Sequence, residues 1–171
     1  MYLVSFIKSI GSLTLKTFSG LKQSEKWATS YLHTVEEKFD GKFDKKTLEK
    51  IVKRYSIQQH FINDSFSSLY GRNNVEKEKI RNLLYFIMVS VYDDFFDDKT
   101  LTIEQIDSIF YHPEVFTPET FFEKVFIYTH TSLLNDVADK AQYFKDFEGL
   151  HIAQKDSLEQ FNPNVTDETL L

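Results

Sequence analysis

The chain has 171 residues, of which 42% are hydrophobic and 27% charged, with a net charge of −6 and no cysteine. These values are ordinary for one globular domain, and they exclude a disordered chain, a disulfide framework and a cysteine-based metal site. No stretch clusters five or more lysines and arginines, which makes nucleic acid and an anionic membrane poor partners. The two uncharged runs, Asn82–Tyr92 and Val125–Asn135, are too short for a transmembrane segment. The lack of cysteine is compatible with a reducing, cytoplasmic location.

Apolar residues recur at helical spacing almost throughout, and only five glycines and three prolines interrupt them. The pattern predicts an amphipathic first helix over residues 3–13 and a second helix that Ser24 caps and that ends near Asp40-Gly41. Asp44 is expected to cap a long third helix that ends at Gly71. The high aromatic content, 16% of residues, suits a thick helical core or the wall of an apolar cavity. We therefore expect an all-α fold in a single domain over residues 1–171.

A fourth helix is predicted from about Val75 into an aspartate-rich sequence. Its middle, Leu83–Tyr92, is apolar all round, so this helix is expected to be buried on every side. Thr102 and Gln105 then fit the capping box of a short fifth helix, which ends at His112-Pro113.

The remaining third of the chain is also expected to be helical. Thr117 can cap a helix with Pro118 at its favoured first position, and helix continues to about Phe161. The segment that begins at Thr166 is typical of the cap and first turn of another helix. We therefore expect a chain that is truncated at its C-terminus and that self-associates through an exposed apolar face. A frayed acidic tail is the alternative.

Four aspartates lie within six positions at the end of the fourth helix, namely Asp93, Asp94, Asp97 and Asp98. At about 100° per residue they share one arc of about 140°, which continues a largely apolar stripe, so they are expected to face the interior or a cleft. Like charges at i,i+4 repel each other, and carboxylates at a helix C-terminus oppose the macrodipole. A hard divalent cation such as Mg²⁺ would remove both penalties. The alternative is a solvated acidic helix end.

The sequence DDFFD at residues 93–97 resembles the first aspartate-rich DDxxD motif of class I isoprenoid synthases. This all-α superfamily comprises the prenyl diphosphate synthases, the terpene cyclases and the squalene/phytoene synthases. The stretch Asn63–Asp98 is similar to the squalene/phytoene-type layout, with Ser65-Phe66, a basic loop, and a helix that carries Arg81 and Tyr85-Phe86. The resemblance implies a helical bundle of the isoprenoid-synthase type, of which this chain is the N-terminal portion.

The resemblance also implies the chemistry of the acidic residues. Asp93 and Asp97, then Asp94 and with less weight Asp98, bind Mg²⁺ ions that grip the diphosphate of a prenyl substrate. Ionisation of that diphosphate gives an allylic carbocation in an apolar cavity, which is the chemistry of a transferase or lyase of isoprenoid biosynthesis. Arg72 contacts the diphosphate on this interpretation, or is a plain surface arginine on the alternative one. No catalytic side chain is assigned besides these.

The chain departs from the superfamily in two respects. Members are longer, and they carry a second metal motif downstream. The nearest candidate, Asn135–Tyr143, has Asp139 where Ser or Thr is expected and Tyr143 where Glu is expected, so Asn135, Asp136 and Asp139 are interpreted as a polar helix face. We therefore expect this chain alone to be inactive. The alternative function is that of a non-catalytic helical bundle whose acidic cluster binds a cation or a protein partner.

Overall fold

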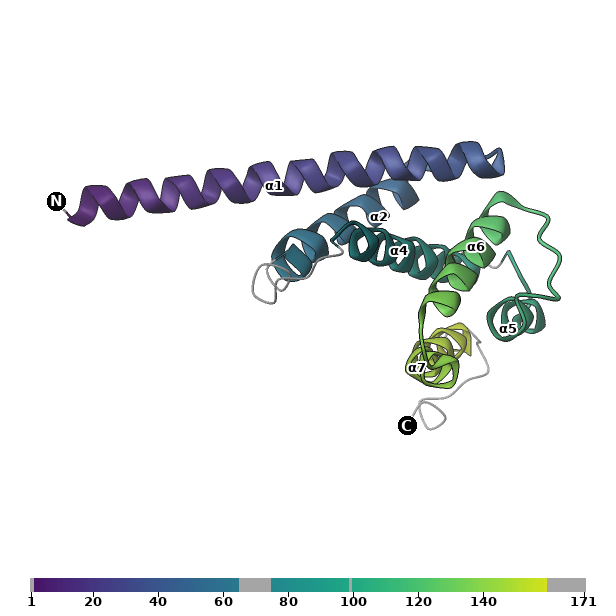
Figure 1. The fold of residues 1–171 in the computed structure, drawn as a ribbon. Coiled ribbons are helices and arrows are strands. Elements are labelled where there is room, and N and C mark those ends of the chain that lie inside the picture. The colour runs from purple at the N-terminus through teal and green to yellow at the C-terminus, as the bar shows by residue number, and fades with distance from the viewer. Residues whose placement is uncertain (1, 65–74, 99, 160–171) are drawn as a thin grey trace. The chain divides into compact units, whose positions relative to one another are not determined.

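The computed structural model describes residues 2–64, 75–98 and 100–159, and every regular element in these ranges is helical (Figure 1). In chain order the elements are α1 (Tyr2–Phe39), α2 (Lys45–Gln58), the π-helix η1 (Gln59–Asn63), α4 (Val75–Asp97), α5 (Ile103–Tyr111), α6 (Phe121–Asp136) and α7 (Lys140–Glu159). The all-α prediction is confirmed. The chain divides into two compact units, Met1–Phe86 and Ile87–Leu171, and α4 contributes one part to each.

One helix, α1, takes the place of the two N-terminal helices that the sequence predicted. Ser24 lies within α1 rather than at a helix start, because the residues on both sides of it continue the helix and none is a proline. The predicted end near Asp40-Gly41 is confirmed. Asp40 has a φ of 49°, and the Gly41 N–H donates to the carbonyl of Glu36 at 3.1 Å, which is the pattern of a Schellman helix end.

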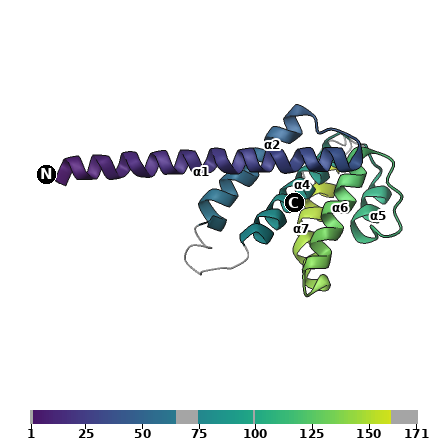
Figure 2. The same cartoon turned by 45° about the horizontal axis from the view of Figure 1, so that its top comes forward.

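The first unit is built by α2 and η1 packing along the C-terminal half of α1 (Figures 1 and 2). Trp27 of α1 stacks on Tyr55 of α2 with ring centroids 5.5 Å apart. The apolar side chains buried in this unit on α1 and α2 include Ala28, Leu32, Val35 and Ile51. Asp44 caps α2 as predicted, since its Oδ1 accepts the Thr47 N–H at 2.9 Å.

The continuation of α2 differs from the predicted long α-helix, because the chain forms the π-helix η1 at Gln59–Asn63. At this level Gly20 of α1 leaves room for the imidazole ring of His60, which a Cβ at position 20 would overlap. The buried Gln59 amide donates to Asp64 at 2.7 Å and accepts from Asn82 of α4 at 3.3 Å. This amide therefore fixes η1 against α4. The predicted helix end at Gly71 lies outside the described residues.

The second unit has an aromatic core around the C-terminal half of α4. The Tyr92 ring lies 5.3 Å from the rings of both Phe96 and Phe126 and 5.6 Å from that of Phe110, measured between centroids. Most of Leu83–Tyr92 is buried, but Tyr85 is 40% exposed, so the prediction that α4 is buried on every side is wrong at that position. None of the described helices is long and apolar enough to cross a membrane.

Helix boundaries in the second unit are predicted in part. The capping box of Thr102 and Gln105 is confirmed, and α5 ends at Tyr111 as expected. The next helix starts at Phe121 instead of Pro118, because Thr120 and Glu123 form a second capping box whose two reciprocal bonds outweigh the single cap that Thr117 offers.

A break separates α6 from α7. Helix α6 ends at Asp136, and α7 begins at Lys140 with the carboxylate of Asp139 accepting the Gln142 N–H at 3.0 Å. Asp139 is thus a helix cap, and the interpretation of Asn135, Asp136 and Asp139 as one polar helix face is wrong.

Candidate functional site

The acidic cluster, Asp93, Asp94, Asp97 and Asp98, lies at the C-terminal end of α4 in the second unit. The first two aspartates are half-buried and the last two are exposed. Between them, Phe95 and Phe96 are only 3% and 2% exposed, and the Phe95 ring lies 5.6 Å from that of Phe126 on α6. The DDFFDD sequence therefore has an anchored aromatic side and an acidic side.

Helix geometry explains this division. At about 100° per residue the buried residues of the last two turns (Val91, Tyr92, Phe95 and Phe96) fall on the arc opposite the four aspartates. Two phenylalanines gain far more from burial than carboxylates, which lose hydration when they are buried, so the phenylalanines determine which side of the helix faces the core. Asp97 and Asp98 are exposed and so do not face the interior, while the other expectation, that the aspartates face a cleft, stays a prediction.

One side chain from another helix contacts the cluster directly. The Gln154 amide on α7 donates a hydrogen bond from Nε2 to Oδ1 of Asp93 at 2.8 Å. The Asp98 N–H donates to the Asp94 carbonyl at 3.0 Å, which extends the helical pattern to the last residue of the cluster. Gln154 thus restrains the orientation of the Asp93 carboxylate, a role that the sequence did not indicate.

The donors of the cluster suit a hard cation that is only partly held by protein. Among the described residues, no three His, Cys, Asp or Glu side chains form a group that could hold a metal ion. Mg²⁺ commonly takes only one or two protein carboxylates and completes its octahedron with water and substrate phosphates. Asp93 and Asp97, one turn apart on α4, can supply such a pair. A metal ion at this pair would therefore need most of its ligands from water or a bound anion.

A buried hydroxyl lies next to the cluster on the same arc of α4. Ser90 is fully buried, and in the described part of the chain its Oγ has no hydrogen-bond partner. Such groups are rare in folded proteins, where buried polar atoms are nearly always paired with protein, water or an ion. Ser90 is one turn before Asp93 and Asp94.

Other predicted residues fall outside this site. Arg72, the predicted diphosphate contact, and Ser65-Phe66 lie outside the described residues. Arg81 belongs to the first unit, where its Nη1 donates to Glu78 at 3.1 Å.

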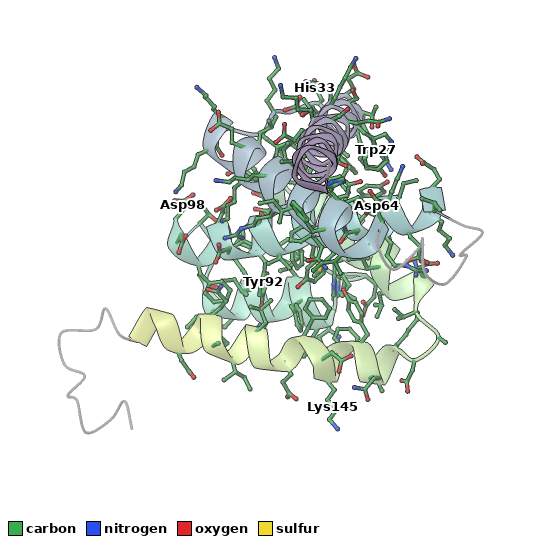
Figure 3. The ribbon with its side chains drawn as sticks, turned by 90° about the vertical axis from the view of Figure 1, so that its left-hand side faces the viewer. Trp27, His33, Asp64, Tyr92, Asp98 and Lys145 are labelled. Carbon is green, nitrogen blue, oxygen red and sulfur yellow. The ribbon has the colours of Figure 1, made fainter. Side chains whose placement is uncertain are left out.

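A hydrogen-bonded chain, buried at Tyr92 and His151 and partly exposed at Asp107 and Lys155, runs beside the cluster and was not predicted. The His151 imidazole on α7 is bonded through Nδ1 to the Tyr92 hydroxyl and through Nε2 to Oδ1 of Asp107 at 2.8 Å. Lys155 closes the chain by donating from Nζ to both Asp107 oxygens, at 3.1 and 3.0 Å. Since a carboxylate only accepts, Nε2 carries the proton and Nδ1 accepts from Tyr92. Figure 3 shows Tyr92 among the core rings, whereas Asp98 lies at the edge of α4.

Burial controls the protonation of this chain. It lowers the pKa of His151 below the ordinary value, although the hydrogen bond to Asp107 acts in the opposite direction. Burial likewise raises the pKa of Tyr92. The neutral forms of both rings are therefore the stable ones at neutral pH. His151 is 44 positions from Asp107 and 59 from Tyr92, so no local sequence pattern could have revealed this hydrogen-bonded chain.

A second histidine, His130, is also buried and hydrogen-bonded through both ring nitrogens. His130 of α6 donates from Nε2 to the Phe110 carbonyl at 2.9 Å, and its Nδ1 is hydrogen-bonded to the Tyr143 hydroxyl at 3.0 Å. Burial lowers its pKa, with the bond to Phe110 opposing that shift. Nε2 carries a proton, because the Phe110 carbonyl can only accept.

Comparison with protein-family models, with curated proteins and with solved structures gives no match to this chain. Function is therefore inferred from the residues and from the resemblance of the aspartate-rich motif.

Proposed function

We propose that the protein is class I isoprenoid synthase-like and that its acidic cluster binds Mg²⁺ together with the diphosphate of a prenyl substrate, in preparation for ionisation of that substrate. The observation that supports this is the two-sided end of α4. Phe95 and Phe96 fix the helix end in the core, while the DDxxD aspartates remain on the side that a ligand can reach.

Each aspartate of the cluster has a role in this proposal. Asp93 and Asp97 hold the metal, and Asp94 and Asp98 add negative charge that attracts it. Gln154 orients Asp93 through the bond at 2.8 Å. When bound, Mg²⁺ supplies Lewis acidity to the oxygens of the leaving diphosphate. Arg72 is the proposed cationic contact to the same diphosphate.

A non-catalytic role for the cluster is the second candidate. It is favoured by the exposure of Asp97 and Asp98 and by the finding that no three ligating side chains converge in the described part of the chain. In that case the cluster attracts a cation or a basic partner surface without selecting a diphosphate. The two candidates differ in whether metal and diphosphate bind interdependently.

Calorimetric titration of the protein with farnesyl diphosphate, in 5 mM Mg²⁺ and in chelator, separates the two candidates. We expect Mg²⁺ to tighten farnesyl diphosphate binding at least tenfold, within the usual range of coupling between two ligands. Asp97→Asn should abolish that coupling. Asp146→Asn is the matched control, because Asp146 is, like Asp97, an exposed carboxylate on a helix, and it lies on α7 outside the cluster.

The proposal fails if farnesyl diphosphate binds equally well in chelator, or if Asp97→Asn binds both ligands as the wild type does. Binding of Mg²⁺ that is unaffected by farnesyl diphosphate supports the non-catalytic candidate.

A further inference from the structure

The N-terminal part of α1 differs in charge from the rest of the chain. Residues 1–24 contain three lysines, Lys8, Lys16 and Lys22, and no acidic residue, whereas the other 147 residues hold 17 basic and all 26 acidic side chains. The segment thus carries +3 and the remainder −9. Glu25 is the first acidic residue.

Most of the large apolar residues of this segment share one side of the helix. With about 100° per residue, six of them fall in one arc of about 140°, namely Leu3, Phe6, Ile7, Ile10, Leu13 and Phe18. Thr14 and Thr17 also lie in this arc, and Val4 and Leu15 lie outside it. Lys8 and Lys16 fall with Ser5, Ser9 and Ser12 in an opposite arc of about 100°. This is the pattern of a helix that lies in the plane of a membrane interface.

The N-terminal part of α1 extends beyond the part against which α2 and η1 pack (Figures 1 and 2). Packing of η1 on α1 reaches Gly20, where the His60 ring sits. In Figures 1 and 2 the purple end of α1 extends beyond α2 and η1. The 17 positions from Tyr2 to Phe18 span about 26 Å at 1.5 Å per residue, which is enough to lie along a bilayer surface.

We propose that residues 2–18 of α1 bind the surface of an anionic lipid bilayer. The apolar arc enters the boundary between headgroups and acyl chains, and Lys8 and Lys16 face the headgroup phosphates. A bilayer complements the segment better than a second copy does, because headgroup phosphates lie beside the acyl boundary and so meet the lysines as well as the apolar arc, whereas a copy that pairs through the apolar arc meets only that arc. The proposal revises the expectation that an anionic membrane is a poor partner, which depended on the lack of a lysine cluster; no such cluster is required, since insertion of the apolar arc supplies part of the affinity. The proposal is independent of the function assigned to the aspartates.

Sedimentation of the full chain with lipid vesicles tests the proposal. We expect binding to vesicles that contain phosphatidylglycerol, and at least about tenfold weaker binding to pure phosphatidylcholine or in 0.5 M salt. Lys8→Glu/Lys16→Glu should weaken binding by at least about tenfold, and Phe6→Ser/Ile10→Ser should abolish it. The matched control is Lys45→Glu/Lys145→Glu, which reverses two exposed lysines outside the segment.

Circular dichroism and thermal melting show whether each variant keeps its helices and its core. The proposal is overturned if the wild type does not sediment with phosphatidylglycerol vesicles, or if the control variant loses binding as much as Lys8→Glu/Lys16→Glu does. It is also overturned if Phe6→Ser/Ile10→Ser dissociates a dimer in analytical ultracentrifugation without any change in vesicle binding, because a second copy then covers the apolar arc.

Discussion

The hydroxyl of Tyr92 on α4 is hydrogen-bonded to Nδ1 of His151 on α7, and both rings are 97% buried. The next residue of α4, Asp93, is bonded to Gln154, which lies three residues after His151 on α7. Two consecutive residues of one helix are therefore paired with two residues one turn apart on the other. The register of α4 against α7, and with it the orientation of the first aspartate of the cluster, is set by a buried bond and a half-buried one.

Tyr92→Phe should destabilise the second unit. The substitution keeps the ring and its aromatic contacts but leaves the buried Nδ1 of His151 without a donor, which costs about 1–3 kcal/mol of the free energy of unfolding. Chemical denaturation measures the loss. Tyr111→Phe is the control, because the Tyr111 ring also contacts His151 but is 37% exposed, so it should change stability by less than about 0.5 kcal/mol. Equal effects of the two variants would contradict the proposed role of the bond.

The stability of the protein should fall as the pH is lowered from 7.5 to 5.5. Burial lowers the pKa of His130 and His151, so the unfolded chain, with a histidine pKa of about 6.5, binds more protons in this range than the folded chain does. Stability from these groups is complete above the unfolded pKa and is lost as the pH falls toward the folded pKa. Each histidine contributes a slope of at most about 1.4 kcal/mol per pH unit.

Denaturation at several pH values measures this slope. The charged groups that act on His151 are Asp107 and Glu148, which favour its protonation, and Lys155, which opposes it. His151→Gln removes one titrating ring while it keeps a donor for Asp107, so the slope should become smaller. A free energy of unfolding that stays level or rises on acidification would show that the acidic neighbours outweigh burial.

The fold could be predicted where its signals are local. The cap at Asp44 and the capping box at Thr102 depend on residues three positions apart, and both are confirmed. Ser24 offers the same kind of signal but lies inside α1, because a cap residue begins a helix only where the preceding residues are not already helical. Thr117 and Thr120 are both possible caps for the next helix. The helix starts after Thr120, because Glu123 forms the reciprocal bond of a capping box with it.

The candidate site was predictable in part for the same reason. The aspartates stand together in the sequence, so their common arc on α4 follows from helix geometry alone. Which side of α4 faces the core depends on Phe126, and the restraint on Asp93 depends on Gln154, 61 residues away. Contacts of this separation arise only when helices pack, and a single sequence contains no local trace of them.

Two glycines within helices should respond oppositely to alanine. Gly149 of α7 has no atom within 4 Å of the position of a Cβ, so Gly149→Ala should raise the free energy of unfolding by up to about 1 kcal/mol through helix propensity. At Gly20 the same change forces the His60 ring to move, and overpacking of this kind costs about 1–3 kcal/mol. Denaturation of Gly20→Ala with and without His60→Ala separates the two effects. If His60→Ala does not recover the loss, the close approach is not its cause.

The two sides of the α4 end should also respond oppositely to substitution. Asp97→Asn removes a charge that repels Asp93 and opposes the helix macrodipole, so it should leave stability unchanged or raise it by about 0.3–1 kcal/mol without Mg²⁺. Phe96→Ala, on the buried side, should cost about 3–5 kcal/mol. Denaturation in chelator and in Mg²⁺ with inorganic diphosphate measures both variants, and ligand should stabilise the wild type but not Asp97→Asn. A loss of more than about 1 kcal/mol for Asp97→Asn in chelator would mean that the carboxylate has a structural partner, because removal of an unpaired charge at a helix C-terminus cannot lower stability.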